Sequence, residues 1–253
     1  MTRIVCDTMI WYYLSKGEVK IPDPKKYILV CTYLTLTELA FTPNNFKKLE
    51  QVQDAVRQIL NSEPELILLH PFDYARTLVD KNFQPEFDFE NDLVFGFLRV
   101  LLNHPKDGLI DNKFKNQLLD ISAKRKENGG DWASFLNNLN EPSKGISRVL
   151  KKYHSEEWQT LKFKEWFVLR LNQLSDTFYT SDIINWKAFV FYEGVYKRYH
   201  RNLIISKMKA DINDDNDLKN MIYVQPSNLY WTSEKRWKTI AKEANLEKYL
   251  YLE

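Results

Sequence analysis

The chain has 253 residues, and its 36 basic and 34 acidic side chains give a formal net charge of +2. This near-balance excludes a strongly basic nucleic-acid-binding arm and an acidic tail, although it allows a local basic face. With 44% hydrophobic and 28% charged residues, the composition is that of a globular protein. Only 7 glycines and 9 prolines are present, so few residues would break a helix. The sequence predicts one large domain, or a small domain with an insertion, in which helices dominate.

The N-terminal part of the chain predicts alternating strands and helices. Short apolar runs at residues 3–6, 27–31 and 66–70 are typical of buried strands. Between the second and third runs, apolar residues recur at steps of three and four over residues 46–60, which predicts a helix. This alternation indicates an α/β fold with a parallel sheet.

The middle of the chain has an almost entirely helical pattern. We expect helices over about residues 88–102, 111–126, 144–153, 155–174 and 181–201. Gly129 and Gly130 are expected to stop the second of these helices. We therefore divide the chain into a core formed by residues 1–70 and 203–253 and an inserted α-helical subdomain of residues 71–202.

The C-terminal part regains α/β character. An acidic loop at residues 211–217 leads into a short apolar helix at residues 218–223. Residues 229–232 predict a strand, and residues 233–244 predict the helix that follows it. Residues 249–252 can add a short strand at the edge of the sheet.

Acidic residues recur where the predicted strands end or where the next helix begins. They are Asp7, Glu38, either Asp214 or Asp217, and Glu234. The carboxyl ends of parallel strands share one edge of a sheet, so these acids are expected to lie together. Neighbouring carboxylates repel one another unless a cation intervenes, and Mg²⁺ or Mn²⁺ is the natural occupant of an all-oxygen site. A single acid after a strand is more commonly a helix cap, so position alone does not establish a site.

The sequence around these acids resembles that of PIN-domain nucleases. Residues 4–14 carry an apolar strand, a turn similar to Asp-Thr-Asn, and an aromatic helix, while residues 34–39 place a glutamate after a strand. Residues 217–223 place an aspartate before a short apolar helix, and residues 230–237 end a strand in threonine, followed by an acid and a helix. The four segments occur in the family's order and lie within the part of the chain assigned to the core. The helical middle has no counterpart.

This resemblance implies a three-layer, PIN-like α/β core and a metal-dependent nuclease, with an endoribonuclease favoured. Asp7, Glu38 and Asp217 would hold Mg²⁺ or Mn²⁺, with Glu234 as the fourth acid. Asp214 competes with Asp217 for the third position and is otherwise a possible outer metal ligand. The implied products carry a 5′-phosphate and a 3′-hydroxyl.

Two departures from the family pattern keep other functions open. Met9 stands where the family often has asparagine, and Glu234 stands where aspartate is usual. A catalytically inactive binding or scaffold protein is therefore one alternative. A structure-specific DNA nuclease is another, because the same acids serve either nucleic acid. The resemblance also implies a toxin or defence role with an inhibitory partner protein, and a homodimer is a further expectation.

The best candidates for contacts with nucleic acid adjoin the last acid. Lys235, Arg236 and Lys238 follow Glu234 closely and can bind phosphates without sequence preference. Thr8 can orient an acid or a water molecule on the metal. The other basic clusters, including residues 124–126, are more consistent with solvated helix faces.

Cys6 and Cys31 lie in strand-like runs and are expected to be buried thiols in a reducing cytosol.

Several further classes of protein are excluded by the sequence. The acidic loop lacks the glycine and the bidentate glutamate of an EF-hand. No glycine-rich nucleotide-binding loop occurs, and no apolar run reaches the roughly 18 residues of a membrane-spanning helix. The chain begins in a strand rather than a signal peptide, so we expect a cytoplasmic protein with no membrane partner.

Overall fold

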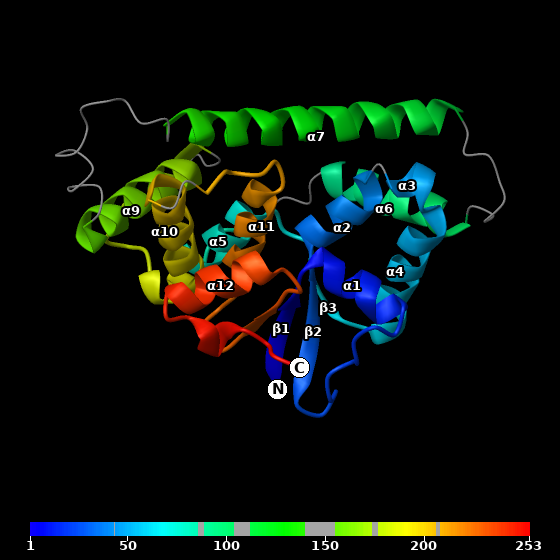
Figure 1. Cartoon of the computed structure of the whole chain (residues 1–253), viewed down its shortest axis with the longest axis horizontal. Helices are drawn as coiled ribbons and strands as arrows, with labels where there is room; N and C mark the ends of the chain where they lie inside the picture. Colours follow the sequence, from blue (N-terminus) through cyan, green and yellow to red (C-terminus); the bar gives the residue numbers. More distant parts are fainter. Residues whose placement is uncertain (43, 86–88, 104–111, 140–154, 174–176, 206–207) are drawn as a thin grey trace.

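A computed structural model of the protein describes the whole chain except residues 43, 86–88, 104–111, 140–154, 174–176 and 206–207. The helix expected over residues 144–153 lies outside the described residues. At the centre is a four-stranded parallel sheet with the strand order β3-β2-β1-β4 (Figure 1). Its strands are β1 (Thr2–Cys6), β2 (Tyr27–Thr32), β3 (Glu65–Ile67) and β4 (Leu229–Trp231). The predicted α/β class with a parallel sheet is confirmed.

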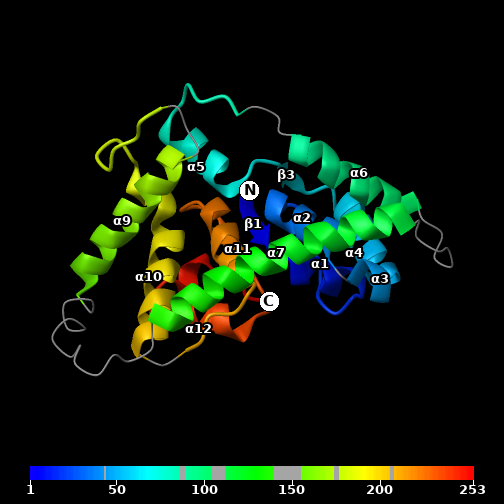
Figure 2. The same cartoon turned by 90° about the horizontal axis from the view of Figure 1, so that it is seen from above.

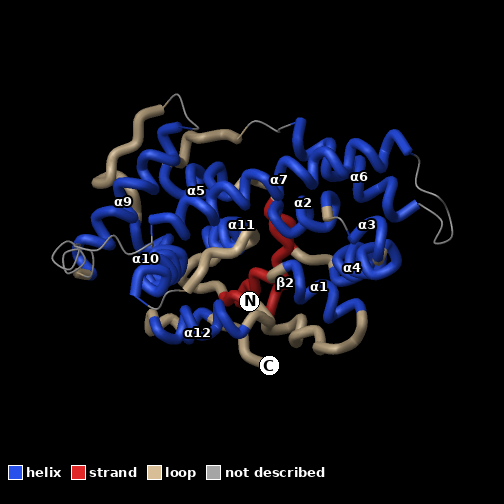
Figure 3. The backbone as a smooth tube through the Cα atoms, turned by 45° about the horizontal axis from the view of Figure 1, so that its top comes forward, coloured by secondary structure: helices blue, strands red, loops and turns tan. Residues whose placement is uncertain are grey.

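The described helices cover both faces of this sheet (Figure 3). They are α1 (Thr8–Ser15), α2 (Tyr33–Phe41), α3 (Asn44–Lys47), α4 (Leu49–Ser62), α5 (Pro71–Val79), α6 (Phe89–Asn103), α7 (Asn112–Leu139), α9 (Glu156–Gln173), α10 (Val190–Ile205), α11 (Asp214–Asn220) and α12 (Lys235–Glu243). Short 3-10 helices occur at Trp186–Phe189, Met221–Tyr223 and Glu247–Tyr249. Among the described helices, none is both long and apolar enough to cross a membrane.

The two central strands divide their side chains between two hydrophobic cores. Ile4 and Cys6 of β1 pack in one core with α1, α2, α4 and α6, whereas Val5 faces the other core with α5, α9, α10 and α12. β2 alternates in the same way, with Cys31 in the first core and Val30 in the second. Successive residues of a strand point to opposite faces, and strands covered on both faces are apolar throughout. Cys6 and Cys31 are buried free thiols, as predicted.

The helical middle of the chain contributes to both cores. Phe163 and Phe167 of α9 and Tyr192 of α10 belong to the same buried cluster as Val5 and Val30 of the sheet. In the other core, α6 packs against α2 and α4. The residues that we separated as an insertion therefore bury their apolar side chains against the sheet and its helices.

The predicted end of a helix at Gly129 and Gly130 is wrong, because α7 continues through both glycines. A Cβ atom at Gly129 would lie 2.5 Å from the carbonyl oxygen of Ile212 and 2.9 Å from its Cγ1 atom. The glycine therefore lets α7 approach the loop that precedes α11. This packing outweighs the roughly 1 kcal/mol by which glycine disfavours a helix interior.

The predicted strand at residues 249–252 is reduced to a single parallel bridge. Leu250 is paired with Tyr230 of β4, and the backbone N–H of Tyr251 donates to the Tyr230 carbonyl over 2.9 Å. The residues just before this bridge form a 3-10 helix, so too few extended residues remain to build a strand.

The two glycines of α7 provide a matched test of the close approach to Ile212. Gly129→Ala should lower the free energy of unfolding by about 1–3 kcal/mol, because the added methyl group overlaps a backbone carbonyl. Gly130→Ala should raise it by about 0.5–1 kcal/mol, because its Cβ would lie 3.9 Å from the nearest atom and alanine favours the helix. Urea denaturation measures both, and equal effects would contradict the packing described.

Candidate active site

Asp7 lies directly after β1, at the position that caps the N-terminus of α1. Its side chain makes no capping hydrogen bond to α1. Instead, Thr232 Oγ1, just beyond β4, donates to Asp7 Oδ2 over 2.7 Å. The backbone continues the same strand pairing, since the Asp7 N–H donates to the Trp231 carbonyl over 2.9 Å. Asp7 is only 5% exposed, and besides its contact with Thr232 its carboxyl group interacts with the backbone of Thr8 and Met9, which lowers its pKa.

Glu38 is carried by α2, the helix that follows β2. It lies within the helix rather than in a loop or in the first turn, and Thr8 Oγ1 donates a hydrogen bond to Glu38 Oε2. The helix begins beside the sheet because the Thr32 side chain caps it, accepting the Thr35 N–H over 3.3 Å. Thr8 begins α1 immediately after Asp7, so this hydrogen bond joins the two helices that follow the central strands.

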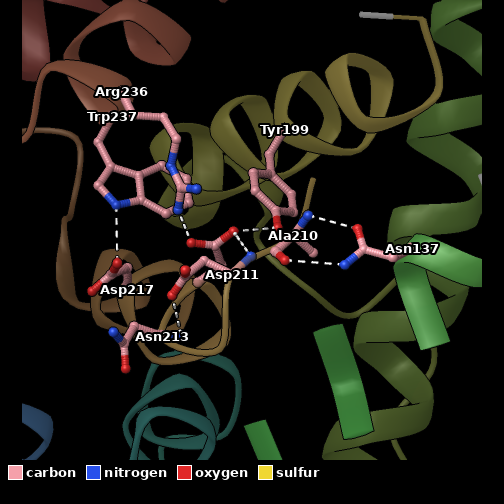
Figure 4. A network of polar contacts seen from close by, with 9 residues as sticks. Asn137, Tyr199, Ala210, Asp211, Asn213, Asp217, Arg236 and Trp237 are labelled. Atoms are coloured by element: carbon pink, nitrogen blue, oxygen red, sulfur yellow. Dashed lines mark hydrogen bonds and ion pairs between the residues drawn. The ribbon is translucent and has the colours of Figure 1, made fainter. Parts of the chain in front are cut away.

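The other two acids come from the C-terminal part of the chain. Asp217 lies in α11, and Trp237 Nε1 of α12 donates to its Oδ2 atom over 3.1 Å (Figure 4). Glu234 immediately precedes α12, and its backbone N–H donates to Thr232 Oγ1 over 3.1 Å. Thr232 therefore contacts both the Asp7 carboxylate and the Glu234 backbone.

Asp7, Glu38, Asp217 and Glu234 lie close enough to perturb one another's ionisation. Burial is the main cause that raises the pKa of each carboxyl group, and for Glu38 the value rises to about 7. The charges of Asp7 and Glu234 also raise the pKa of Glu38. The charges of the other three acids help to raise the pKa of Asp217 well above its usual value. The structure therefore brings these four predicted acids together at the carboxyl edge of the sheet.

Asp214 is placed differently from these four acids. Its buried carboxylate forms an ion pair with Arg236, and Asp214 Oδ2 accepts from the Tyr199 hydroxyl over 2.6 Å and from the Asp211 N–H over 2.8 Å (Figure 4). The Arg236 guanidinium also lies 4.8 Å from the centre of the Trp237 ring. Asp214 and Arg236 thus neutralise each other, and of the two candidates for the third acid it is Asp217 that interacts with Asp7 and Glu38.

The predicted contacts with nucleic acid are therefore divided. Lys235 is exposed at the start of α12, whereas Arg236 is turned inward toward Asp214. Lys238 lines a pocket of about 250 Å³ that also includes Tyr13 and Thr232. This pocket reaches Thr232, the residue that donates to Asp7, so Lys238 lines a cavity next to the support of the first acid.

The structure adds one charged residue that the sequence did not single out. Arg125 of α7 donates from Nη1 to the Thr37 carbonyl over 2.9 Å, and its charge opposes the rise in the pKa of Glu38. Its sequence signal was the basic run at residues 124–126. The sequence favours a solvated helix face for that run, since nothing in it shows which member turns toward α2.

The chemistry of the four acids fits a hard divalent cation. All the donors are carboxylate oxygens, which Mg²⁺ and Mn²⁺ prefer, and their burial penalises the charged forms until a cation compensates them. With the side chains as they stand, no three His, Cys, Asp or Glu residues of the described ranges are arranged to hold a metal ion. Binding would therefore draw the carboxylates closer together, against a repulsion that the cation itself removes.

Comparisons with protein-family models, with curated proteins and with solved structures find no match for this chain. The similarity to PIN-domain nucleases therefore rests on the four sequence segments that carry the acids.

The acids predict a stability that falls as the pH rises when no divalent cation is present. The folded protein holds a proton on Glu38 up to about pH 7, whereas the usual pKa is 4.5. This contribution to stability is complete below about pH 4.5 and is lost as the pH rises through 7. Burial lowers the pKa of His200 from 6.5 to about 4, so His200 makes the protein more stable as the pH rises through this range. A variant is therefore needed to isolate the acids.

Asp7→Asn should raise the melting temperature at pH 8 in EDTA by about 2–4 °C, because it removes one buried negative charge from the cluster. It should also reduce the stabilisation that Mn²⁺ gives to the wild type. Asp92→Asn, which changes an exposed acid on α6, should alter neither quantity. Thermal unfolding from pH 5.5 to pH 8 measures both variants, and an unchanged melting temperature for Asp7→Asn would contradict the mutual repulsion.

Proposed function

We propose that the protein is a metal-dependent nuclease with a PIN-like core, and that it cleaves RNA internally. The observation that carries this proposal is the meeting of four acids from four separate segments at one edge of the parallel sheet. The sheet order also supports it, because β4 pairs with β1 and sets the last predicted acid beside the first. The preference for RNA comes from the family resemblance.

Asp7, Glu38 and Asp217 would hold the cation, with Glu234 as the fourth acid. When bound, Mg²⁺ or Mn²⁺ would lower the pKa of a water molecule and compensate the negative charge at phosphorus during an in-line displacement. The products would carry a 5′-phosphate and a 3′-hydroxyl, as the resemblance implies. Each of these three acids accepts a hydrogen bond from a neutral side chain.

These donors are Thr232 for Asp7, Thr8 for Glu38 and Trp237 for Asp217. Neutral donors fix the orientation of a carboxylate without cancelling its charge, and therefore preserve its attraction for a cation. Burial of the acids lowers the local dielectric, which strengthens every charge interaction within the site.

A binding or scaffold protein is the second candidate function. It is favoured by the absence, within the described ranges, of three acids already arranged to hold a metal, together with the methionine at position 9. Met9 is 37% exposed, and its thioether cannot donate the hydrogen bond by which an asparagine amide could support Asp7. Cation binding separates the two candidates.

The decisive experiment is cleavage of fluorescent single-stranded RNA and DNA with Mn²⁺, Mg²⁺ or EDTA. We expect the wild type to cleave RNA only with a divalent cation, and Asp7→Asn, Glu38→Gln and Asp217→Asn each to lower the rate by about a hundredfold or more. Asp92→Asn should retain the wild-type rate. Cleavage that persists in EDTA, or in Asp7→Asn, would contradict the assignment, and preferred cleavage of DNA would correct the substrate.

A further inference from the structure

α7 crosses the carboxyl edge of the sheet, the edge at which the four acids lie. Figure 1 shows the helix along the side on which α1 begins, and Figure 2 shows it passing over β1 between α2 and α11. Contacts with both of those helices confirm this course. α2 and α11 carry Glu38 and Asp217, so α7 spans the two helices that supply acids from opposite sides of the site.

Both ends of α7 are anchored in hydrophobic cores. Leu118 is buried in the core that contains α2, α4 and α6, whereas Ala133 and Leu136 are buried in the core that contains α10 and α12. The Asn137 side chain exchanges two hydrogen bonds with the Ala210 backbone, of 3.1 Å and 2.8 Å (Figure 4). The part of α7 between these anchors is consequently fixed in position over the edge of the sheet.

Arg125 belongs to this central part of α7. Its Nη1 atom donates to the Thr37 carbonyl over 2.9 Å, and its guanidinium carbon lies 6.0 Å from the centre of the Phe41 ring. Thr37 precedes Glu38 in α2, and the charge of Arg125 favours the ionised form of Glu38. A helix anchored at both ends therefore holds the Arg125 guanidinium near Glu38, while Lys124 and Lys126 on either side of Arg125 are exposed.

The guanidinium has the chemistry that a phosphate requires. It is planar, permanently charged and carries five N–H donors, so it can contact a carbonyl oxygen and a phosphate oxygen together. Arg236, the arginine of the basic cluster after Glu234, is paired with Asp214. A phosphodiester that approaches the buried acids would meet a negative field, and a fixed cation beside them would offset this repulsion.

We propose that Arg125 is a substrate-binding residue that contacts a phosphate of single-stranded nucleic acid at the carboxylate site. This inference rests on the proposed nuclease function. It means that α7 positions the Arg125 guanidinium at the site. An alternative role for Arg125, an internal contact that inhibits the acids, predicts the opposite change in activity and is an outcome of the test below.

The test compares Arg125→Ala and Arg125→Lys with Lys126→Ala, the matched loss of a neighbouring exposed charge. Binding of a labelled single-stranded RNA is measured in Mg²⁺ by fluorescence anisotropy over a series of salt concentrations, with all variants in an Asp7→Asn background. We expect Arg125→Ala to raise the Kd about tenfold to a hundredfold. The slope of log K against log salt should fall by about 0.7, as for one lost single-strand phosphate contact.

Arg125→Lys keeps the charge but loses the planar fork, so it should keep the salt slope and recover only part of the affinity. It also serves as the test variant if Arg125→Ala does not fold, which thermal unfolding will show. Lys126→Ala should leave both the Kd and the slope nearly unchanged. A purely structural role of Arg125 would not change the salt slope, so an unchanged slope and Kd overturn the inference.

Cleavage by the same variants with Asp7 intact distinguishes the remaining outcomes. We expect a lower kcat/KM for Arg125→Ala, carried mainly by KM. Faster cleavage by Arg125→Ala would show an inhibitory contact and overturn the inference, and equal cleavage would overturn it while leaving the nuclease function intact. If the wild type neither binds nor cleaves nucleic acid, the proposed function fails, and the role of Arg125 with it.

Discussion

The parallel pairing of β4 with β1 is the constraint on which the rest of the site depends. It places the last strand of the chain beside the first, with Cys6 opposite Trp231. The residues after the two strands, Asp7 and Thr232, then lie within hydrogen-bonding distance although 225 positions separate them in the sequence. Without this pairing, Glu234 and α12 would not reach the site, and the Asp217 carboxylate would lose its contact with Trp237.

The same arrangement gathers negative charge in a buried place, which costs stability in the absence of a cation. Burial raises the pKa values of all four acids, and repulsion from neighbouring acids adds to the rise at Glu38, Asp217 and Glu234. By contrast, the nearby Asp214 carboxylate is compensated within the fold by Arg236 and Tyr199. The contrast between Asp214, which Arg236 compensates, and the four acids with raised pKa values marks the four as the candidate site, because selection for stability alone would not favour such a group.

The sequence predicted the elements that local patterns specify. All four strands of the sheet follow from short apolar runs, and Asp7 and Glu234 follow from their places after the first and the last strand, whereas Glu38 and Asp217 lie within α2 and α11. It did not predict that α7 continues through Gly129. Glycine is needed there because the helix packs closely against Ile212, which is far away in the sequence, so the local pattern gives no sign of this contact. For the same reason the inward turn of Arg236 and the contact of Arg125 with Thr37 could not be predicted, since each depends on long-range packing. The division into a core and an insertion stays a prediction.

The central claim is that the four acids form one site that exchanges protons for a divalent cation. Titration calorimetry with Mn²⁺ at pH 7, repeated in buffers of different ionisation enthalpy, measures the protons released on binding. We predict saturable binding with release of on the order of one proton, and a smaller release at pH 8.5, because cation binding requires deprotonated ligands. Binding with no proton release at pH 7, or no binding at all, would contradict this account of the site.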